Sequence, residues 1–421
     1  MLLLAEKTVD IKRITATVIG EMNVIDLNNI EKYRENNRIE AKKATGGLPK
    51  SLWETYSSFA NTLGGIILLG VEEYRDKSLH PVNLLDPDEL IEEFWEIAND
   101  IQKVSTNILS YDDVYVQKIE EKHIIVITVP KAKRFDRPVY LDGSIHNSYR
   151  RNGEGDYRCT LDQINAMVRD SEIKTQDMNI IECMTASVFN TDSLHSYRIK
   201  MSNVKPNNRL QNLSDKDFLQ AIGAIGVGED LLFHPTAAGL LMFGKSEFIK
   251  KEYPYYCLEY KETTQDDKHT IISSNLNSDC ENLYDFFIKV FEKISYDIKL
   301  TANIKSDITP ITTALQEALA NCLINADYYG SNGVVIMKDD ESITISNPGG
   351  FRVELDAARA GGISDPRNTA IMRMFNLIGI GSNDGFGISN IFSVWKSHGL
   401  VLPVIEESFN PESITLKLSF V

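Results

Sequence analysis

The fold of the first half of the chain is decided by residues 35–73, ENNRIEAKKATGGLPKSLWETYSSFANTLGGIILLGVEE. Charged and apolar residues alternate from Arg38 to Lys42, which predicts a half-buried strand. Apolar residues then recur at helical spacing between residues 52 and 63, and Gly64-Gly65 predicts the left-handed turn that ends this helix. The run of residues 66–71 is apolar without alternation, which is typical of a strand covered on both faces.

Carboxylates stand at both ends of this stretch. The alternation predicts that Glu40 lies on the open face of the first strand, while Glu72 and Glu73 follow the second strand. Glu35 reaches the same edge if the chain turns at Asn36-Asn37, a pair that tolerates turn geometry. Three such carboxylates would form a hard-oxygen site for Mg²⁺ or Mn²⁺, able to activate a water against a phosphodiester. Solvated surface acids are the alternative, because Glu is rarely buried unpaired.

The order of these motifs resembles the AlbA-like core of the Schlafen family. The shared pattern is E-x4-E-x-K, then a helix ending in A-N-T-x-G-G, then an apolar strand ending in G-V-acid-acid, and the likeness continues to about residue 165. In nucleolytic Schlafen members the matching carboxylates form the metal site for RNA cleavage. The resemblance therefore implies that Glu35 and Glu40 are catalytic metal ligands, with Glu72 or Glu73 as the third. The third acid is Glu here, where the family usually has Asp.

The composition narrows the remaining possibilities. With 421 residues the chain exceeds one ordinary core, which predicts two or more domains. Its 60 acidic and 44 basic residues give a net charge of −16, so any nucleic-acid contact needs a local basic patch. The five cysteines form no CxxC pair and the seven histidines form no HxxxH pair, so neither a disulfide framework nor a zinc site is predicted. No run approaches a membrane span and Met1-Leu2-Leu3-Leu4 is too short for a signal sequence, so a cytoplasmic protein is expected.

One segment contains more basic than acidic residues, unlike the chain as a whole. Residues 131–158 carry seven basic and four acidic residues, with three tyrosines interleaved. Cations that hold phosphates beside rings that stack on bases are typical of a nucleic-acid groove, although a charge run is more often a solvated face. The likeness to the Schlafen family assigns residues 137–140 and 148–153 to its final hairpin. The predicted nucleic-acid-binding residues are Lys131, Lys133, Arg134, Arg137, Tyr149, Arg150 and Arg151.

The second informative region is residues 311–329, ITTALQEALANCLINADYY. Its apolar residues form one face of a helix, while Glu317 and Asn321 are four residues apart and therefore adjacent on the other face. A Glu in such a pair can orient or deprotonate a water, and the Asn carbonyl can ligate a Mg²⁺ that carries nucleotide phosphates. ExxxN alone most often marks two exposed polar residues. Two glycine groups follow, Asn347-Pro348-Gly349-Gly350 and Gly385-Phe386-Gly387, and glycines let a backbone approach phosphate closely.

This second set of motifs resembles the divergent ATP-binding domain, related to the GHKL ATPase fold, that follows an AlbA-like domain in many bacterial and archaeal proteins described as transcriptional regulators. The likeness spans about residues 200–420. It implies a role for each of seven residues: Glu317 activates water, Asn321 ligates Mg²⁺, Asn347, Gly349 and Gly350 border the base, and Gly385 and Gly387 border the phosphates. Two departures predict weak or absent ATP hydrolysis: Asn325-Ala326 replace a histidine and an arginine, and Gly381-Ser382-Asn383 replace an acid.

We therefore expect an α+β protein, with a Schlafen AlbA-like mixed-sheet domain over residues 1–172 and a connecting region and GHKL-like α/β sandwich over residues 173–421, its core at about 301–421. The leading function is an ATP-responsive, metal-dependent Schlafen-like nuclease that cuts RNA, for example tRNA in defence against phage. The alternative is a non-catalytic, ATP-binding transcriptional regulator that binds DNA through its AlbA-like domain. A third possibility is an interaction scaffold in which both sites are degenerate. Expected cofactors are Mg²⁺ or Mn²⁺ and ATP. Expected partners are nucleic acid and nucleotide but no membrane, and a homo-oligomer is compatible with the sequence.

Overall fold

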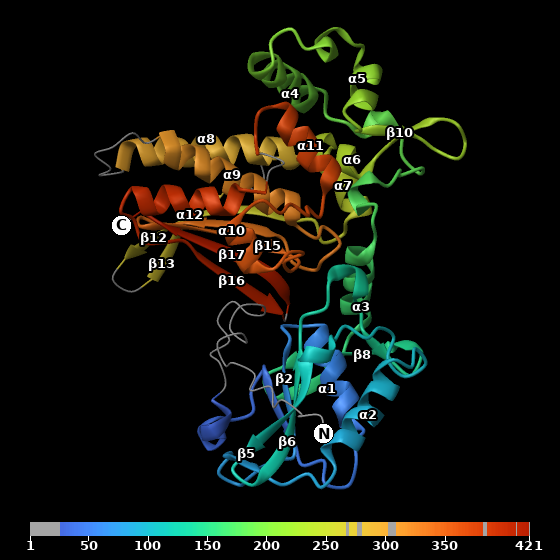
Figure 1. Ribbon diagram of the computed structural model, residues 1–421. Helices are drawn as coiled ribbons and strands as arrows, with labels where there is room; N and C mark the ends of the chain where they lie inside the picture. Colours follow the sequence, from blue (N-terminus) through green and yellow to red (C-terminus); the bar gives the residue numbers. More distant parts are fainter. Residues whose placement is uncertain are drawn as a thin grey trace, which may run out of the picture. The chain divides into compact units, whose positions relative to one another are not determined.

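The chain divides into two compact units, Met1–Ser171 and Glu172–Val421. The computed structural model describes residues 26–266, 269–275, 280–301, 309–381, 385–409 and 411–420, so the Met1–Leu4 segment lies outside the described residues. Figure 1 shows helices and mixed sheets in both units. The predicted α+β class is therefore confirmed. No helix in the described ranges is both long enough and apolar enough to cross a membrane.

Unit 1 interleaves helices with short strands. In chain order these are β1 (Ile39–Lys42), α1 (Ser51–Ala60), β2 (Gly65–Leu69), β3 (Val71–Glu73), β4 (Leu79–Pro81), α2 (Pro87–Ala98), β5 (Val114–Ile119), β6 (Lys122–Val129), β7 (Tyr140–Leu141), β8 (Ser144–Asn152), β9 (Gly155–Arg158) and α3 (Leu161–Ser171).

The main sheet of unit 1 has the strand order β1-β2-β6-β5. β1 runs parallel to β2, and β6 and β5 continue the sheet with antiparallel pairing. Ile67 and Leu69 of β2 pack with Phe59 of α1 in one buried cluster, while Leu68 packs in a second cluster on the opposite face. The absence of alternation in this strand is thus explained, because both of its faces are covered.

The apolar run does not continue as one strand into the two glutamates. Gly70 adopts φ +81°, and a Cβ there would lie 2.8 Å from Cγ of Leu84, so the close approach also requires glycine. After this turn β3 pairs with β4 in a separate two-stranded sheet. The prediction that Glu72 and Glu73 lie at the end of β2 is therefore wrong. Successive side chains of β3 point to opposite faces, so the two acids do not share one.

The end of α1 is held by side-chain hydrogen bonds to the third sheet of unit 1, whose order is β7-β8-β9. Asn61 Nδ2 donates to the carbonyl oxygens of Val139 at 2.8 Å and Tyr149 at 3.1 Å, and its Oδ1 accepts from Val139 N at 2.8 Å. Ser57 Oγ accepts from Tyr149 N at 3.0 Å. These buried side chains act as a neighbouring strand would, which gives the A-N-T motif a structural reason.

Unit 2 contains a helical region with one small hairpin, followed by a larger sheet. Its elements are α4 (Thr191–Val204), α5 (Asp215–Ala221), β10 (Ile225–Val227), β11 (Phe233–Pro235), α6 (Ala237–Phe243), α7 (Ser246–Glu252), β12 (Leu258–Asp266), β13 (His269–Asn275), α8 (Leu283–Thr301), α9 (Thr309–Asn325), β14 (Val334–Lys338), β15 (Ser342–Pro348), α10 (Leu355–Ala360), α11 (Thr369–Leu377), α12 (Gly387–Ser397), β16 (Val404–Phe409) and β17 (Glu412–Ser419).

The large sheet has the order β13-β12-β14-β15-β17-β16, with β12 and β14 parallel and the other neighbours antiparallel. Helices α8, α9 and α12 lie along one face of it (Figure 1). Leu315, Leu319 and Leu323 of α9 pack with Ile343 and Ile345 of β15 in the core. The apolar stripe of α9 thus faces the sheet, which directs the rest of its surface to other neighbours.

Candidate nucleotide site and carboxylate cluster

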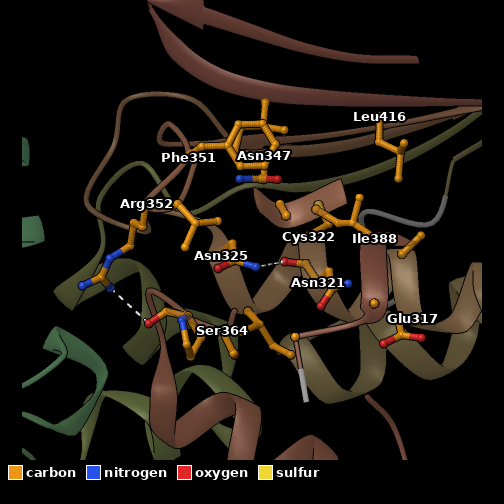
Figure 2. Close-up of a pocket in the computed structure, with 18 of the residues that line it drawn as sticks. Glu317, Asn321, Cys322, Asn325, Asn347, Phe351, Arg352, Ser364, Ile388 and Leu416 are labelled. Carbon is orange, nitrogen blue, oxygen red and sulfur yellow. Dashed lines mark hydrogen bonds between the residues drawn. The ribbon is translucent and has the colours of Figure 1, made fainter. Parts of the chain in front are cut away.

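A pocket in unit 2 is enclosed by α9, the first turn of α12, strands β15 to β17 and the segments 350–353 and 363–366. Figure 2 shows Glu317, Asn321 and Asn325 along one helix, with Leu416 across the cavity from them. The sheet side of the pocket is apolar. It is formed by Ile345, Ile405, Ile414 and Leu416. One wall therefore suits a flat apolar group and the other carries polar side chains.

The pocket gathers residues that are far apart in the sequence. Six of the seven predicted nucleotide-binding residues line it: Glu317, Asn321, Asn347, Gly350, Gly385 and Gly387. The seventh, Gly349, is not a lining residue. It adopts φ +90°, and a Cβ there would lie 2.5 Å from Nη1 of Arg367, so its absent side chain makes room for that guanidinium.

Gly387 brings the two predicted motifs into contact. It is the first residue of α12, and a Cβ at this position would lie 2.7 Å from Glu317 Oε1 and 2.8 Å from Asn321 Nδ2. The first turn of α12 therefore approaches the ExxxN pair as closely as a backbone can. A helix N-terminus presents N–H groups without intrahelical partners, and the absent side chain of Gly387 lets Glu317 and Asn321 lie directly beside them.

Burial determines the properties of two polar side chains in the pocket, namely the pKa of Glu317 and the hydrogen bonds of Asn347. Burial raises the pKa of the Glu317 carboxyl above its usual value, and a hydrogen bond from the Asn390 side chain opposes part of this rise. Asn347 is 6% exposed, and its Nδ2 donates to Pro348 O at 3.1 Å. None of the described residues donates a hydrogen bond to Oδ1 of Asn347. That oxygen can therefore accept one from a ligand.

Asn325, where the related family has a histidine, is turned toward its own helix. Its Nδ2 donates to the carbonyl oxygen of Asn321 at 2.9 Å (Figure 2). Its own carbonyl oxygen accepts from Nη1 of Arg367, and Nη2 of the same arginine donates to Gly350 O at 3.1 Å. Arg367 thus joins two walls of the pocket. Arg367 was not among the residues predicted for this site, although Pro366-Arg367-Asn368 directly before a helix was a usable signal.

Residues 382–384 lie outside the described residues, so the expected replacement of an acid at Ser382 and Asn383 has no structural counterpart here. Gly381, just before them, lines the pocket. Arg352 also lines it and was not predicted. Its Nη1 donates to Pro366 O at 3.0 Å, as Figure 2 shows for the labelled arginine.

In unit 1, Glu40 is enclosed by cations and is not on an open face. Its side chain is 13% exposed, with Oε1 2.9 Å from Lys42 Nζ and Oε2 2.7 Å from Nη2 of Arg151. Arg151 is itself 1% exposed at its side chain and pairs with Asp156 Oδ1 at 2.9 Å. The predicted exposure of Glu40 is therefore wrong, because a guanidinium from β8 covers it.

Glu35 has Glu40 and Glu73 as its carboxylate neighbours. Burial raises the pKa of the Glu35 carboxyl, and the nearby charges of Glu40 and Glu73 raise it further. A hydrogen bond from Ala41 N to Glu35 Oε1, at 3.0 Å, opposes the shift. Glu72 instead pairs with Lys43 at 3.1 Å. Of the two alternatives for a third carboxylate, the structure brings Glu73 and not Glu72 toward Glu35.

These carboxylates do not fit a divalent metal ion as they stand. Within the described ranges, no group of three or more His, Cys, Asp or Glu side chains could hold a metal ion. Both oxygens of Glu40 already face cations, and Glu72 pairs with Lys43. The predicted ligand set of Glu35, Glu40 and Glu72 is therefore not assembled in unit 1.

The predicted basic groove is mostly internal. Among its members only Lys133 is exposed and Lys131 is half-buried. The other five are buried, namely Arg134, Arg137, Tyr149, Arg150 and Arg151. Arg134 illustrates the cause, because its Nη1 donates to Asp170 O at 2.7 Å and its guanidinium stacks on Phe135. The expectation that these five side chains present an open basic face is wrong.

The chain thus has two parts, a mixed-sheet unit followed by a unit with helices on a six-stranded sheet. Residues 35–160 match the family model "Schlafen, AlbA_2", and residues 330–416 match "Putative ATP-dependent DNA helicase recG C-terminal". Residues 165–259 match a domain of unknown function, DUF8451. The sequence resemblance is confirmed at the level of these domains. The chain carries a Schlafen AlbA_2 domain and a RecG-related C-terminal domain of the HATPase_c_4 type.

Several solved structures are similar to the chain, including the following two. The DIP2311 protein from Corynebacterium diphtheriae is 15% identical, with 91% of this chain and 74% of that chain covered and a TM-score of 0.45. The N-terminal domain of a "Putative ATP-dependent DNA Helicase RecG-related Protein" from Nitrosomonas europaea is 30% identical, with 31% of this chain and 87% of that chain covered and a TM-score of 0.23. No curated protein matches the chain.

Proposed function

We propose that this protein binds ATP in the pocket of unit 2 and binds nucleic acid through its AlbA-like unit, with the nucleotide acting as a regulatory ligand. The pocket carries this proposal, because it collects the ExxxN pair, Asn347 and both glycine groups around one cavity. The family match covers residues 330–416, whereas Glu317 and Asn321 come from α9 and precede it. The two lines of support are therefore separate in the sequence.

The pocket offers suitable contacts for both the base and the phosphates of a nucleotide. The apolar side formed by β15, β16 and β17 accepts the base, and Asn347 Oδ1 can accept a hydrogen bond from an exocyclic amino group. The first turn of α12 favours the phosphates through its free N–H groups and the helix dipole. Asn321 is the protein ligand we propose for the Mg²⁺ that ATP carries, and Glu317 is the group that orients water.

Thermal unfolding with Mg-ATP tests the nucleotide site in the full chain. ATP at about 100 times its Kd should stabilise the protein by about 2.7 kcal/mol, so the melting temperature should rise with ATP concentration. Asn321→Ala should remove most of this rise. Gln316→Ala is the matched control, because Gln316 lies on the same helix and does not line the pocket. No rise at millimolar ATP in the wild-type protein would overturn the proposal.

A nuclease acting on RNA, tRNA for example, is the second candidate. Glu35 favours it, because a carboxyl whose pKa is raised by burial and by neighbouring Glu40 and Glu73 has the property of a general acid or base. The unassembled ligand set weighs against a metal-dependent reaction.

Labelled tRNA, mRNA and duplex DNA, incubated with Mn²⁺ or EDTA and with or without ATP, separate the two candidates. RNA cleavage that is lost in Glu35→Gln supports the nuclease. Retarded migration of a nucleic acid that stays intact supports the regulator. Neither binding nor cleavage in any arm would reject a nucleic-acid function for unit 1.

A further inference from the structure

A buried aspartate outside the pocket holds one of the helices that frame it. Asp177 lies in the 3-10 turn η5 (Gln176–Met178), within the segment that matches the domain of unknown function, and it is 1% exposed. Its Oδ2 accepts the backbone N–H of Ile371 at 2.9 Å, in the first turn of α11. Its Oδ1 accepts from Thr175 Oγ1 at 2.5 Å. A carboxylate here satisfies a free N–H group and faces the positive end of the helix dipole.

α11 needs this outside acceptor because the residue at its own cap position is used elsewhere. Asn368 precedes the helix, yet its side chain makes no capping hydrogen bond to α11. Its Nδ2 donates to the carbonyl oxygens of Ile324 at 2.9 Å and Ala326 at 2.8 Å, and its backbone N donates to Ile324 O at 3.0 Å. Asn368 therefore binds the C-terminal end of α9, and Asp177 takes over the capping of α11.

The neighbouring residue extends this connection to the pocket. Arg367 is 8% exposed and donates to the carbonyl oxygens of Asn325 and Gly350. Asn325 ends α9 one turn after Asn321, and Gly350 belongs to the turn that follows Asn347. Arg367 and Asn368 thus connect two segments that border the pocket, the end of α9 and the turn at Gly350, to the start of α11. Met372 of α11 also lines the pocket directly.

We propose that Asp177 is a positioning residue for the nucleotide site. It holds the first turn of α11, α11 holds Arg367 and Asn368, and these hold α9 and the Gly350 turn at the spacing that a nucleotide requires. The segment matching the domain of unknown function therefore completes the ATP-binding unit. This inference rests on the proposed binding of ATP in the pocket.

Calorimetric titration of the full chain with Mg-ATP tests the inference, with thermal unfolding measured in parallel. Asp177→Ala should weaken ATP binding by about fivefold or more, a typical size for energetic coupling between connected sites. Asp177→Asn keeps an acceptor oxygen for Ile371 N and should recover part of the affinity. The matched control is Asp285→Asn. Asp285 is a partly buried acid of the same unit that accepts from Ser193 Oγ at 2.9 Å and does not line the pocket.

The control separates positioning from general stability. Asp285→Asn should lower the melting temperature and leave the Kd for ATP unchanged. The inference is overturned if both Asp177 variants keep the wild-type Kd for ATP while lowering the melting temperature as much as Asp285→Asn does. If Asp177→Ala does not fold, the Kd of Asp177→Asn relative to the Asp285 control decides the question. Absence of ATP binding in the wild-type protein rejects the proposed function itself, which is a different result.

Discussion

Replacing Gly387 with alanine should separate nucleotide binding from fold stability. Gly387 opens α12 and its φ is outside the left-handed region, so alanine fits the backbone. The added Cβ would lie 2.7 Å from Glu317 Oε1 and 2.8 Å from Asn321 Nδ2. Because ordinary van der Waals contact begins at 3.4 Å, the Glu317 oxygen must withdraw by about 0.7 Å and the Asn321 nitrogen by about 0.6 Å. The substitution therefore moves the two groups that we assign to ATP binding and touches little else.

The two consequences have opposite signs. Alanine in place of glycine, at a position whose backbone alanine can adopt, stabilises by about 0.4–1 kcal/mol because it lowers the entropy of the unfolded chain, and this offsets the strain of moving two flexible side chains. Binding groups must stay within about 0.5 Å of their productive positions, so we expect the affinity for Mg-ATP to fall by about tenfold, or 1.4 kcal/mol. Calorimetry measures the Kd, and urea unfolding measures the free energy of unfolding.

Ser393→Ala is the matched control for this variant. Ser393 is exposed on the same helix and does not line the pocket, so alanine there improves helix propensity without approaching a ligand. Its Kd for ATP should equal that of the wild-type protein. A wild-type Kd in Gly387→Ala would refute the reasoning, because it would mean that ATP does not depend on Glu317 and Asn321 in their observed positions.

Three further predictions concern charged groups. Arg151→Met leaves Asp156 without its ion pair and Glu40 with Lys42 as its remaining cation, so it should cost about 3 kcal/mol by urea unfolding. The exposed Lys133→Met should stay within about 0.5 kcal/mol, and equal costs would contradict the ion-pair network. Burial raises the pKa of Glu35 in the folded protein above its ordinary value of 4.5, so the contribution of Glu35 to stability is present below pH 4.5 and is lost as the pH rises through the folded pKa. Glu35→Gln should therefore gain stability relative to the wild type over that window, and parallel stability curves from pH 4 to pH 7 would count against this. Glu317→Gln keeps the shape of the pocket and should bind ATP, but any slow hydrolysis measured as phosphate release should stop; hydrolysis at the wild-type rate would exclude Glu317 as the group that activates water.

Local sequence patterns predicted the elements of unit 1 better than their surroundings. The apolar run predicted β2, because a strand covered on both faces needs apolar residues at every position. Where that strand ends was not predictable, since the contact between Gly70 and Leu84 that forces the turn is tertiary. The alternation of charged and apolar residues predicted the strand that contains Glu40, but it did not predict that the Glu40 side chain is covered. Arg151, which covers Glu40, comes from another sheet, and a period of two carries no information about such a partner.

The pocket of unit 2 shows the same division. Glu317 and Asn321 follow from helical spacing and the glycine groups follow from their composition, so six of the residues that line the pocket could be predicted. Arg367 and Asp177 act through backbone groups of distant segments, and such hydrogen bonds leave no periodic signal in the sequence. The prediction of an open basic groove was wrong for a related reason. Composition reports how much charge a segment carries, and burial depends on which way each side chain points.

The hydrogen bonds between the end of α1 and the β7-β8-β9 sheet have a consequence for the backbone beside them. β8 is the central strand of that sheet, and Asn61 supplies partners for the carbonyl oxygen of Tyr149 and for the backbone N–H of Val139, just before β7. Both of these groups are buried, so no water replaces a lost partner. Asn61→Ala would therefore leave two buried backbone groups unsatisfied, at about 1–3 kcal/mol each, although the side chain that is removed belongs to the end of a helix.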